Sequence, residues 1–134
     1  MNDEGRLIAF LGASVLYPAR SRDLLMHLAT RDLFRARWSD RVQGEWIAAL
    51  LRNRPDLTVE QLQRKRRLME EHVNDALVTG YEALVDQLVL PDANDCHVLA
   101  AAIHGGANVI VTMNLRDFPI DALSAHLIEA VRSD

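Results

Sequence analysis

Two short and almost continuous apolar runs constrain the fold more than any other feature of the chain. Residues 7–11 read Leu-Ile-Ala-Phe-Leu, and residues 108–112 read Asn-Val-Ile-Val-Thr. Runs of this kind suit strands that are covered on both faces, as in parallel sheets. Helical patterns lie between them, so strand and helix signals alternate along the chain. This alternation predicts an α/β fold in which helices flank a central parallel sheet.

Apolar spacing and capping residues predict the other elements. Ser39 is the expected N-cap of a helix that reaches residue 53, and residues 58–61 (Thr-Val-Glu-Gln) match a capping box that opens a helix to residue 72. We also expect helices over residues 20–29 and 95–103, and strands over residues 33–38, 77–79 and, at the edge of the sheet, 126–130. No repeat or linker interrupts the pattern, so we expect one domain over residues 1–134.

The composition excludes several classes of protein. The 134 residues are 49% hydrophobic and 25% charged, as in an ordinary soluble domain rather than a disordered chain. Cys96 is the only cysteine, which excludes an intramolecular disulfide, and no Cys or His cluster suggests zinc. No apolar run approaches the roughly 18 residues that span a bilayer. The acidic N-terminus also lacks a signal-peptide core, so we expect a cytoplasmic protein without a membrane partner.

The distribution of basic residues is compatible with RNA binding but does not by itself indicate it. The net charge is −4, and the strongest basic run is residues 64–67 (Arg-Lys-Arg-Arg). This run could meet RNA phosphates. The simpler interpretation, which we favour, is a solvated helix face, because Glu70 and Glu71 follow Arg66 and Arg67 at a spacing of four residues.

Carboxylates stand at three suggestive places. Glu45 shares a helix face with apolar residues, and Asp95 begins the buried face of the helix predicted over residues 95–103. Asn114 and Asp117 follow the run at residues 108–112, and the crevice of a parallel sheet lies beyond the carboxyl ends of its strands. Taken singly, each has a simpler explanation: an exposed glutamate, a helix-capping acid and a local turn.

Two further expectations concern Asp95 and its neighbours. Asp92 or Asn94 can cap the helix equally well, which would leave Asp95 free for another role. His97 points about 100° further round the helix than Asp95, so we expect packing or surface exposure for it rather than catalysis.

Taken together, four segments resemble the PIN-domain family, and in particular its bacterial VapC-like toxins of toxin–antitoxin pairs. They are residues 10–18 (Phe-Leu-Gly-Ala-Ser-Val-Leu-Tyr-Pro), 38–46 (Trp-Ser-Asp-Arg-Val-Gln-Gly-Glu-Trp), 90–102 (Leu-Pro-Asp-Ala-Asn-Asp-Cys-His-Val-Leu-Ala-Ala-Ala) and 109–119 (Val-Ile-Val-Thr-Met-Asn-Leu-Arg-Asp-Phe-Pro). The resemblance covers residues 7–119. It implies a Mg²⁺- or Mn²⁺-dependent ribonuclease whose acids gather at the carboxyl edge of the sheet.

The resemblance also implies roles for individual residues. Glu45, Asp95 and Asp117 match the metal-binding acids, and Asn114 stands with them in the catalytic set. Thr112, Ser14 and Arg116 are the candidates for contacts with substrate, Arg116 with an RNA phosphate. The implied partners are RNA, a cognate antitoxin and a second copy in a homodimer. Relatives often continue beyond residues 126–130, so the chain is either shortened at its C-terminus or naturally short.

One position departs from the family pattern. The family strand reads Phe-Leu-Asp-Ala, whereas this chain has Gly12 where the first acid stands. Glycine offers no side chain to a metal, and the nearby hydroxyl of Ser14 is a poor substitute for a carboxylate. We therefore expect weak or absent metal binding and little or no cleavage. The alternative is a non-catalytic PIN-like module that binds RNA or an antitoxin.

Overall fold

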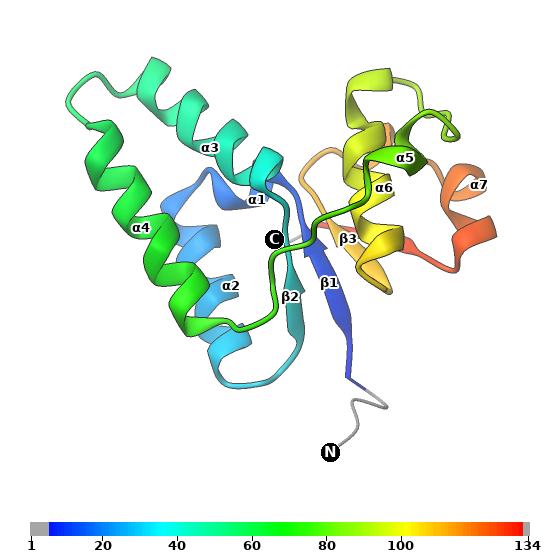
Figure 1. Cartoon of the computed structure of the whole chain (residues 1–134), viewed down its shortest axis with the longest axis horizontal. Coiled ribbons are helices and arrows are strands. Elements are labelled where there is room, and N and C mark those ends of the chain that lie inside the picture. Colours follow the sequence, from blue (N-terminus) through cyan, green and yellow to red (C-terminus); the bar gives the residue numbers. More distant parts are fainter. Residues whose placement is uncertain (1–5, 133–134) are drawn as a thin grey trace.

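A four-stranded parallel sheet forms the centre of the computed structural model, which describes residues 6–132 (Figure 1). The strands are β1 (Ile8–Leu11), β2 (Arg35–Arg37), β3 (Val109–Val111) and β4 (Glu129–Val131), in the order β2-β1-β3-β4. All three neighbouring pairs run parallel. The middle strands β1 and β3 are almost entirely buried, which explains their unbroken apolar sequences. The predicted α/β class is confirmed.

The strand order reverses between β1 and β3. From β1 the chain first adds β2 on one side, and later adds β3 and β4 on the other. Where the order reverses in a parallel sheet, the two connections leave in opposite directions and a crevice opens beyond the carboxyl ends of the strands. The topology alone therefore singles out the ends of β1 and β3 as the place for a site.

The helices lie in two groups beside the sheet (Figure 1). On the left of the view are α1 (Ala13–Leu16), α2 (Ala19–Thr30), α3 (Asp40–Asn53) and α4 (Val59–His72); on the right are α5 (Glu82–Val85), α6 (Cys96–His104) and α7 (Ile120–Leu123). Single 3₁₀ turns complete the fold: η1 (Ala93–Asp95), η2 (Leu115–Asp117) and η3 (Ser124–His126). Within residues 6–132, no helix is both long and apolar enough to cross a bilayer.

The predicted helix starts of α3 and α4 are confirmed by their caps. The Ser39 hydroxyl accepts a hydrogen bond from the Val42 amide at 3.2 Å. At α4 the reciprocal bonds of the capping box are both present: the Gln61 amide donates to the Thr58 hydroxyl at 3.2 Å, and the Thr58 amide donates to the Gln61 side chain at 2.9 Å. Each cap satisfies amides that have no partner inside the helix.

The core lies between the sheet and the helices. Phe10, Trp38, Trp46, Leu99 and Ile110 are fully or almost fully buried. Both tryptophans are therefore core residues.

The prediction of a strand over residues 77–79 is wrong. The segment makes only a single bridge, between Trp38 and Leu77. Two backbone hydrogen bonds hold it, from the Trp38 amide to the Ala76 carbonyl and from the Val78 amide to the Trp38 carbonyl. Gly80 then turns the chain away at a φ of +77°, a left-handed conformation that favours glycine. The pairing therefore ends before a strand can form.

The strand predicted over residues 126–130 begins later in the structure. Residues 124–126 form η3, and Leu127 adopts a left-handed conformation, so the strand occupies Glu129–Val131 rather than residues 126–130. Its predicted place at the sheet edge is confirmed.

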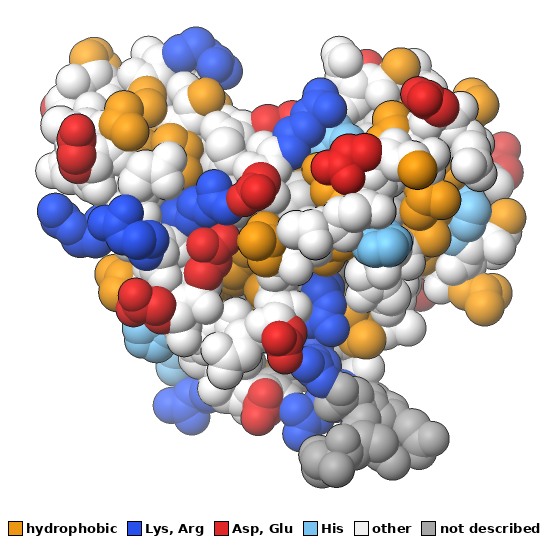
Figure 2. Space-filling model, in the orientation of Figure 1, with side chains coloured by type: hydrophobic (Ala, Val, Ile, Leu, Met, Phe, Trp, Pro, Cys, Tyr) orange, Lys and Arg blue, Asp and Glu red, His pale blue; other side chains and the backbone are white. Residues whose placement is uncertain are grey.

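The basic run of α4 belongs to a largely solvated face. Lys and Arg side chains gather over α4 in Figure 2, and Arg64, Lys65 and Arg67 are exposed. Arg66 instead pairs with Glu70, four residues on, and with Asp40 at the start of α3. The run thus ties α4 to α3 as well as facing solvent.

Candidate active site: an acid pocket between β1 and β3

A pocket of about 140 Å³ lies at the carboxyl ends of β1 and β3; we call it the acid pocket. It is lined by Gly12, Ala13, Ser14, Glu45, Asp95, Val98, Ile110, Thr112, Asn114, Asp117 and Phe118. The four predicted catalytic residues therefore lie around one pocket, beside Gly12. Arg116 is exposed and is not part of this lining, so its contact with substrate stays a prediction.

Two hydroxyls shape the loop that follows β3. The Ser14 hydroxyl accepts a hydrogen bond from the Met113 amide, and the Thr112 hydroxyl accepts one from the Asn114 amide, both at 3.0 Å. The two oxygens lie 3.4 Å apart. These bonds hold the loop that carries Asn114 into the pocket. Both hydroxyls are thus engaged with the backbone, and their predicted contact with substrate remains untested.

Asp92, rather than Asp95, provides the capping side chain before α6. The Asp92 carboxylate accepts a hydrogen bond from the Asn94 amide at 2.9 Å and so caps η1. The Asp95 side chain makes no capping bond at the start of α6. Burial, followed by the negative charges of Asp117, Asp92 and Glu45, raises the pKa of Asp95, although His97 opposes the shift. The ionised form of Asp95 therefore lowers the stability of the folded protein.

Asp95→Asn is expected to stabilise the protein at neutral pH. The pKa of Asp95 in the folded protein lies above the ordinary value of 3.8, so this carboxyl ionises more readily in the unfolded chain. The free energy of unfolding therefore falls as the pH rises from 3.8 through the folded pKa. The amide removes that cost, and we expect the melting temperature to rise by about 1–3 °C at pH 7, a modest shift because solvent screens the exposed part of the group.

Thermal unfolding followed by circular dichroism at several pH values measures the effect. The gain should disappear below the ordinary Asp pKa, where both forms are uncharged, and the exposed Asp121→Asn should change little at any pH. A lower melting temperature for Asp95→Asn at pH 7 would contradict this account.

Glu45 reaches the pocket from α3 with the side chains of His97 and Arg41 beside it. Its Oε2 lies 3.2 Å from Nε2 of His97 and 3.5 Å from Nε of Arg41. Burial opposes ionisation of Glu45, but the contacts and charges of His97 and Arg41 together outweigh it and lower its pKa. Glu45 is accordingly a carboxylate at neutral pH.

The contact of His97 with Glu45 was not foreseen from the sequence. His97 is 3% exposed, which confirms the expected packing role. The available signal was its position as a polar side chain in the otherwise apolar segment of residues 96–102, all of which is buried. Burial of such a group requires a partner.

Gly12 lines the acid pocket without contributing a side chain. It caps α1 in an extended conformation, with φ −78° and ψ 165°, and its amide donates to the Val111 carbonyl at 3.0 Å. A Cβ added here would lie 3.3 Å from the same carbonyl oxygen, a tight contact that requires the β3 backbone to move by a few tenths of an ångström. The dihedral angles at this position are thus ones that any residue adopts, and the Val111 carbonyl is the close neighbour of an added side chain.

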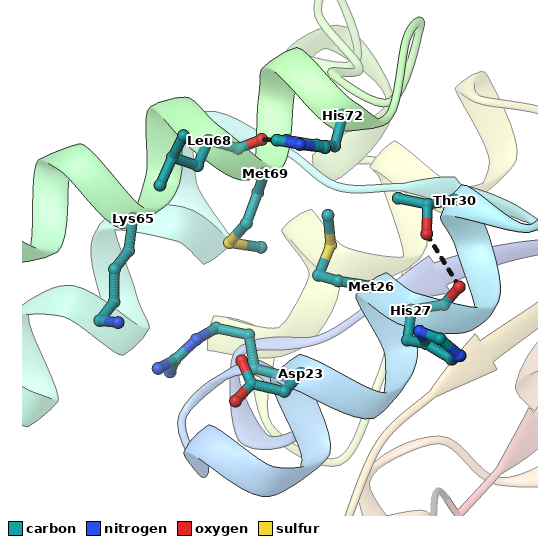
Figure 3. A pocket seen from close by; sticks show the side chains of 9 residues that line it. Asp23, Met26, His27, Thr30, Lys65, Leu68, Met69 and His72 are labelled. Carbon is teal, nitrogen blue, oxygen red and sulfur yellow. Dashed lines mark hydrogen bonds between the residues drawn. The ribbon is translucent and has the colours of Figure 1, made fainter.

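A larger groove lies away from the acid pocket, between α2 and α4. One part, of about 300 Å³, is lined by Asp23 and Met26 on α2 and by Lys65, Leu68 and Met69 on α4, among others. In Figure 3 the two methionines lie between the helices, with Lys65 and Asp23 at one end. Its lining contains none of the predicted site residues.

A family model described as a PIN domain matches residues 9–116, and the chain belongs to this family. A 40-residue stretch is 55% identical to a protein of Mycobacterium tuberculosis named "Putative ribonuclease VapC50". That stretch makes up 30% of this chain and 24% of the relative's length. No solved structure matches the chain significantly.

Proposed function

We propose that this chain is a PIN-type ribonuclease whose RNA cleavage is impaired by glycine at position 12. One observation supports the proposal above all: Glu45, Asp95 and Asp117, from three separate segments, line one pocket at the reversal point of the sheet. Oxygen-rich pockets at such places suit phosphate chemistry. The ribonuclease name of the matching relative agrees with this substrate class.

The residues present do not fit a firmly held Mg²⁺ or Mn²⁺ ion. Such ions require several oxygen ligands in a defined geometry. Among residues 6–132, no group of three or more His, Cys, Asp or Glu side chains is arranged to hold a metal ion. Gly12 supplies no ligand, and Oε2 of Glu45 already faces His97 and Arg41. We therefore propose weak or absent metal binding, with the predicted ligands Glu45, Asp95 and Asp117 forming an incomplete set.

The unaltered chain is expected to show no metal-dependent stabilisation and little cleavage. Binding to the folded state alone raises the melting temperature, so a tightly bound ion would produce a clear shift. Thermal unfolding with and without Mg²⁺ or Mn²⁺, followed by incubation with single-stranded RNA, tests both expectations. A metal-dependent rise in melting temperature together with cleavage by this chain would reject the impairment.

Gly12 also favours a second candidate, a PIN-like module that binds without cutting. Recognition of RNA or of a cognate antitoxin needs surface contacts rather than a complete metal site. Gel-shift and co-purification experiments with this chain distinguish the candidates, because a non-catalytic module retains binding without cleavage. Self-association as a homodimer and a cytoplasmic location belong to the same proposal.

A further inference from the structure

We propose that His97 is a positioning residue that holds the Glu45 carboxylate at the acid pocket without a metal ion. The inference concerns a residue outside the predicted catalytic set, and its relevance to cleavage rests on the proposed function. Its structural basis is the 3.2 Å contact between Nε2 of His97 and Oε2 of Glu45. This contact joins α6 to α3 through Glu45, which lines the pocket.

Because His97 is buried, its contact with Glu45 should orient the carboxylate more strongly than the contact between Arg41 and Glu45 does. Arg41 lies one turn before Glu45 on the same helix, and both side chains are substantially exposed, at 53% and 42%. Exposed pairs of this kind contribute little, because solvent screens them and the side chains lose freedom. His97 is 3% exposed, so its ring is fixed by packing and its direction toward Glu45 is defined.

The protonation pattern of His97 agrees with this role. A ring nitrogen that faces a carboxylate at 3.2 Å carries a hydrogen, so Nε2 is the donor. Nδ1 is buried and has no hydrogen-bond partner among the described residues. In the neutral ring with hydrogen on Nε2, Nδ1 carries none, which avoids burying an unpaired N–H group. Glu45 is thus the one described partner that explains a buried polar ring at this position.

The contact also fixes how Glu45 can act. Both neighbours, His97 and Arg41, approach the same oxygen, Oε2. A carboxylate held through one oxygen has a defined orientation, with the second oxygen remaining for another ligand. Partners that orient ligating groups in this way typically change metal affinity about 10–100-fold when they are removed. In a variant with a complete set of metal ligands, His97 would therefore orient Glu45 as it does in the unaltered chain.

A double-mutant cycle in the unaltered chain tests the contact directly. The variants are His97→Leu, Glu45→Ala and their combination, and the readout is the denaturant midpoint of unfolding. We expect the effect of His97→Leu to shrink markedly when Glu45 is already absent, and His97→Gln, which keeps an N–H donor, to recover part of the loss. Additive effects, as expected of a residue that only fills space, would overturn the inference.

A second measurement separates this inference from the proposed function. In the Gly12→Asp background, Mn²⁺ affinity is measured by electron paramagnetic resonance. We expect His97→Leu to weaken binding about 10–100-fold, His97→Gln to restore most of it, and the exposed His104→Gln on the same helix to leave it unchanged. Unchanged affinity in His97→Leu would contradict the positioning role. Absence of Mn²⁺ binding in Gly12→Asp itself would reject the proposed function, and the double-mutant cycle would still decide the role of His97.

Discussion

Gly12→Asp is expected to convert this chain into a ribonuclease that requires Mg²⁺ or Mn²⁺. The new carboxylate would join Asp95 and Asp117 around the acid pocket and supply the missing charged oxygen ligand. A metal site contributes several kcal/mol of transition-state stabilisation, so we expect cleavage to rise on the order of 10²-fold or more over the unaltered chain. A fluorogenic single-stranded RNA, assayed with each metal and with chelator, measures the gain.

Gly12→Asn is the matched control for this experiment. It has the size of aspartate and meets the same tight contact with the Val111 carbonyl, but it lacks the charge. The extended backbone at position 12 accepts either side chain. Both variants should therefore fold alike, and only the aspartate should cleave RNA. Equal activity in the two variants, or no gain in a folded Gly12→Asp protein, would contradict the assignment of the site.

Trp46→Ala is expected to have the largest effect on stability. Trp46 is fully buried on α3, its Nε1 donates to the Gln43 side chain at 2.6 Å, and the Arg22 guanidinium lies 4.4 Å from the ring centroid. Removing such a side chain leaves a cavity and costs about 3–5 kcal/mol. Arg22 would also lose the aromatic face on which it lies. Urea unfolding measures the loss of free energy.

Val89→Ala provides the reference for that measurement. Val89 is 85% exposed, and surface truncations of this kind usually change stability by less than about 0.5 kcal/mol. If Trp46→Ala unfolds at nearly the same urea concentration as Val89→Ala, the contribution of the buried Trp46 side chain to stability is contradicted.

The sequence was most informative where burial is complete on both faces or where a cap is local. β1 and β3 were predicted because a strand covered on both sides has no polar alternation. The start of α4 was predicted because its capping box involves residues only three positions apart. The gathering of Glu45, Asp95 and Asp117 was predicted from their positions on a parallel sheet and from the family pattern.

The features that escaped prediction depend on distances between elements. Whether residues 77–79 extend the sheet is decided by the short pairing with Trp38 and the turn at Gly80, which no local apolar pattern encodes. The contact of His97 with Glu45 depends on how closely α6 approaches α3. Periodicity placed His97 on a different side of the helix from Asp95 and left packing and surface exposure open, and it does not identify the side chain that His97 meets.

Anomalous diffraction from crystals of Gly12→Asp grown with Mn²⁺ tests the central claim most directly. If glycine at position 12 is what leaves the acid pocket incomplete, a Mn²⁺ peak should stand within coordination distance of the introduced carboxylate and of Asp95 or Asp117, and crystals of the unaltered chain should show no such peak. A well-ordered variant with an empty pocket, or with Mn²⁺ bound only elsewhere, would contradict the account.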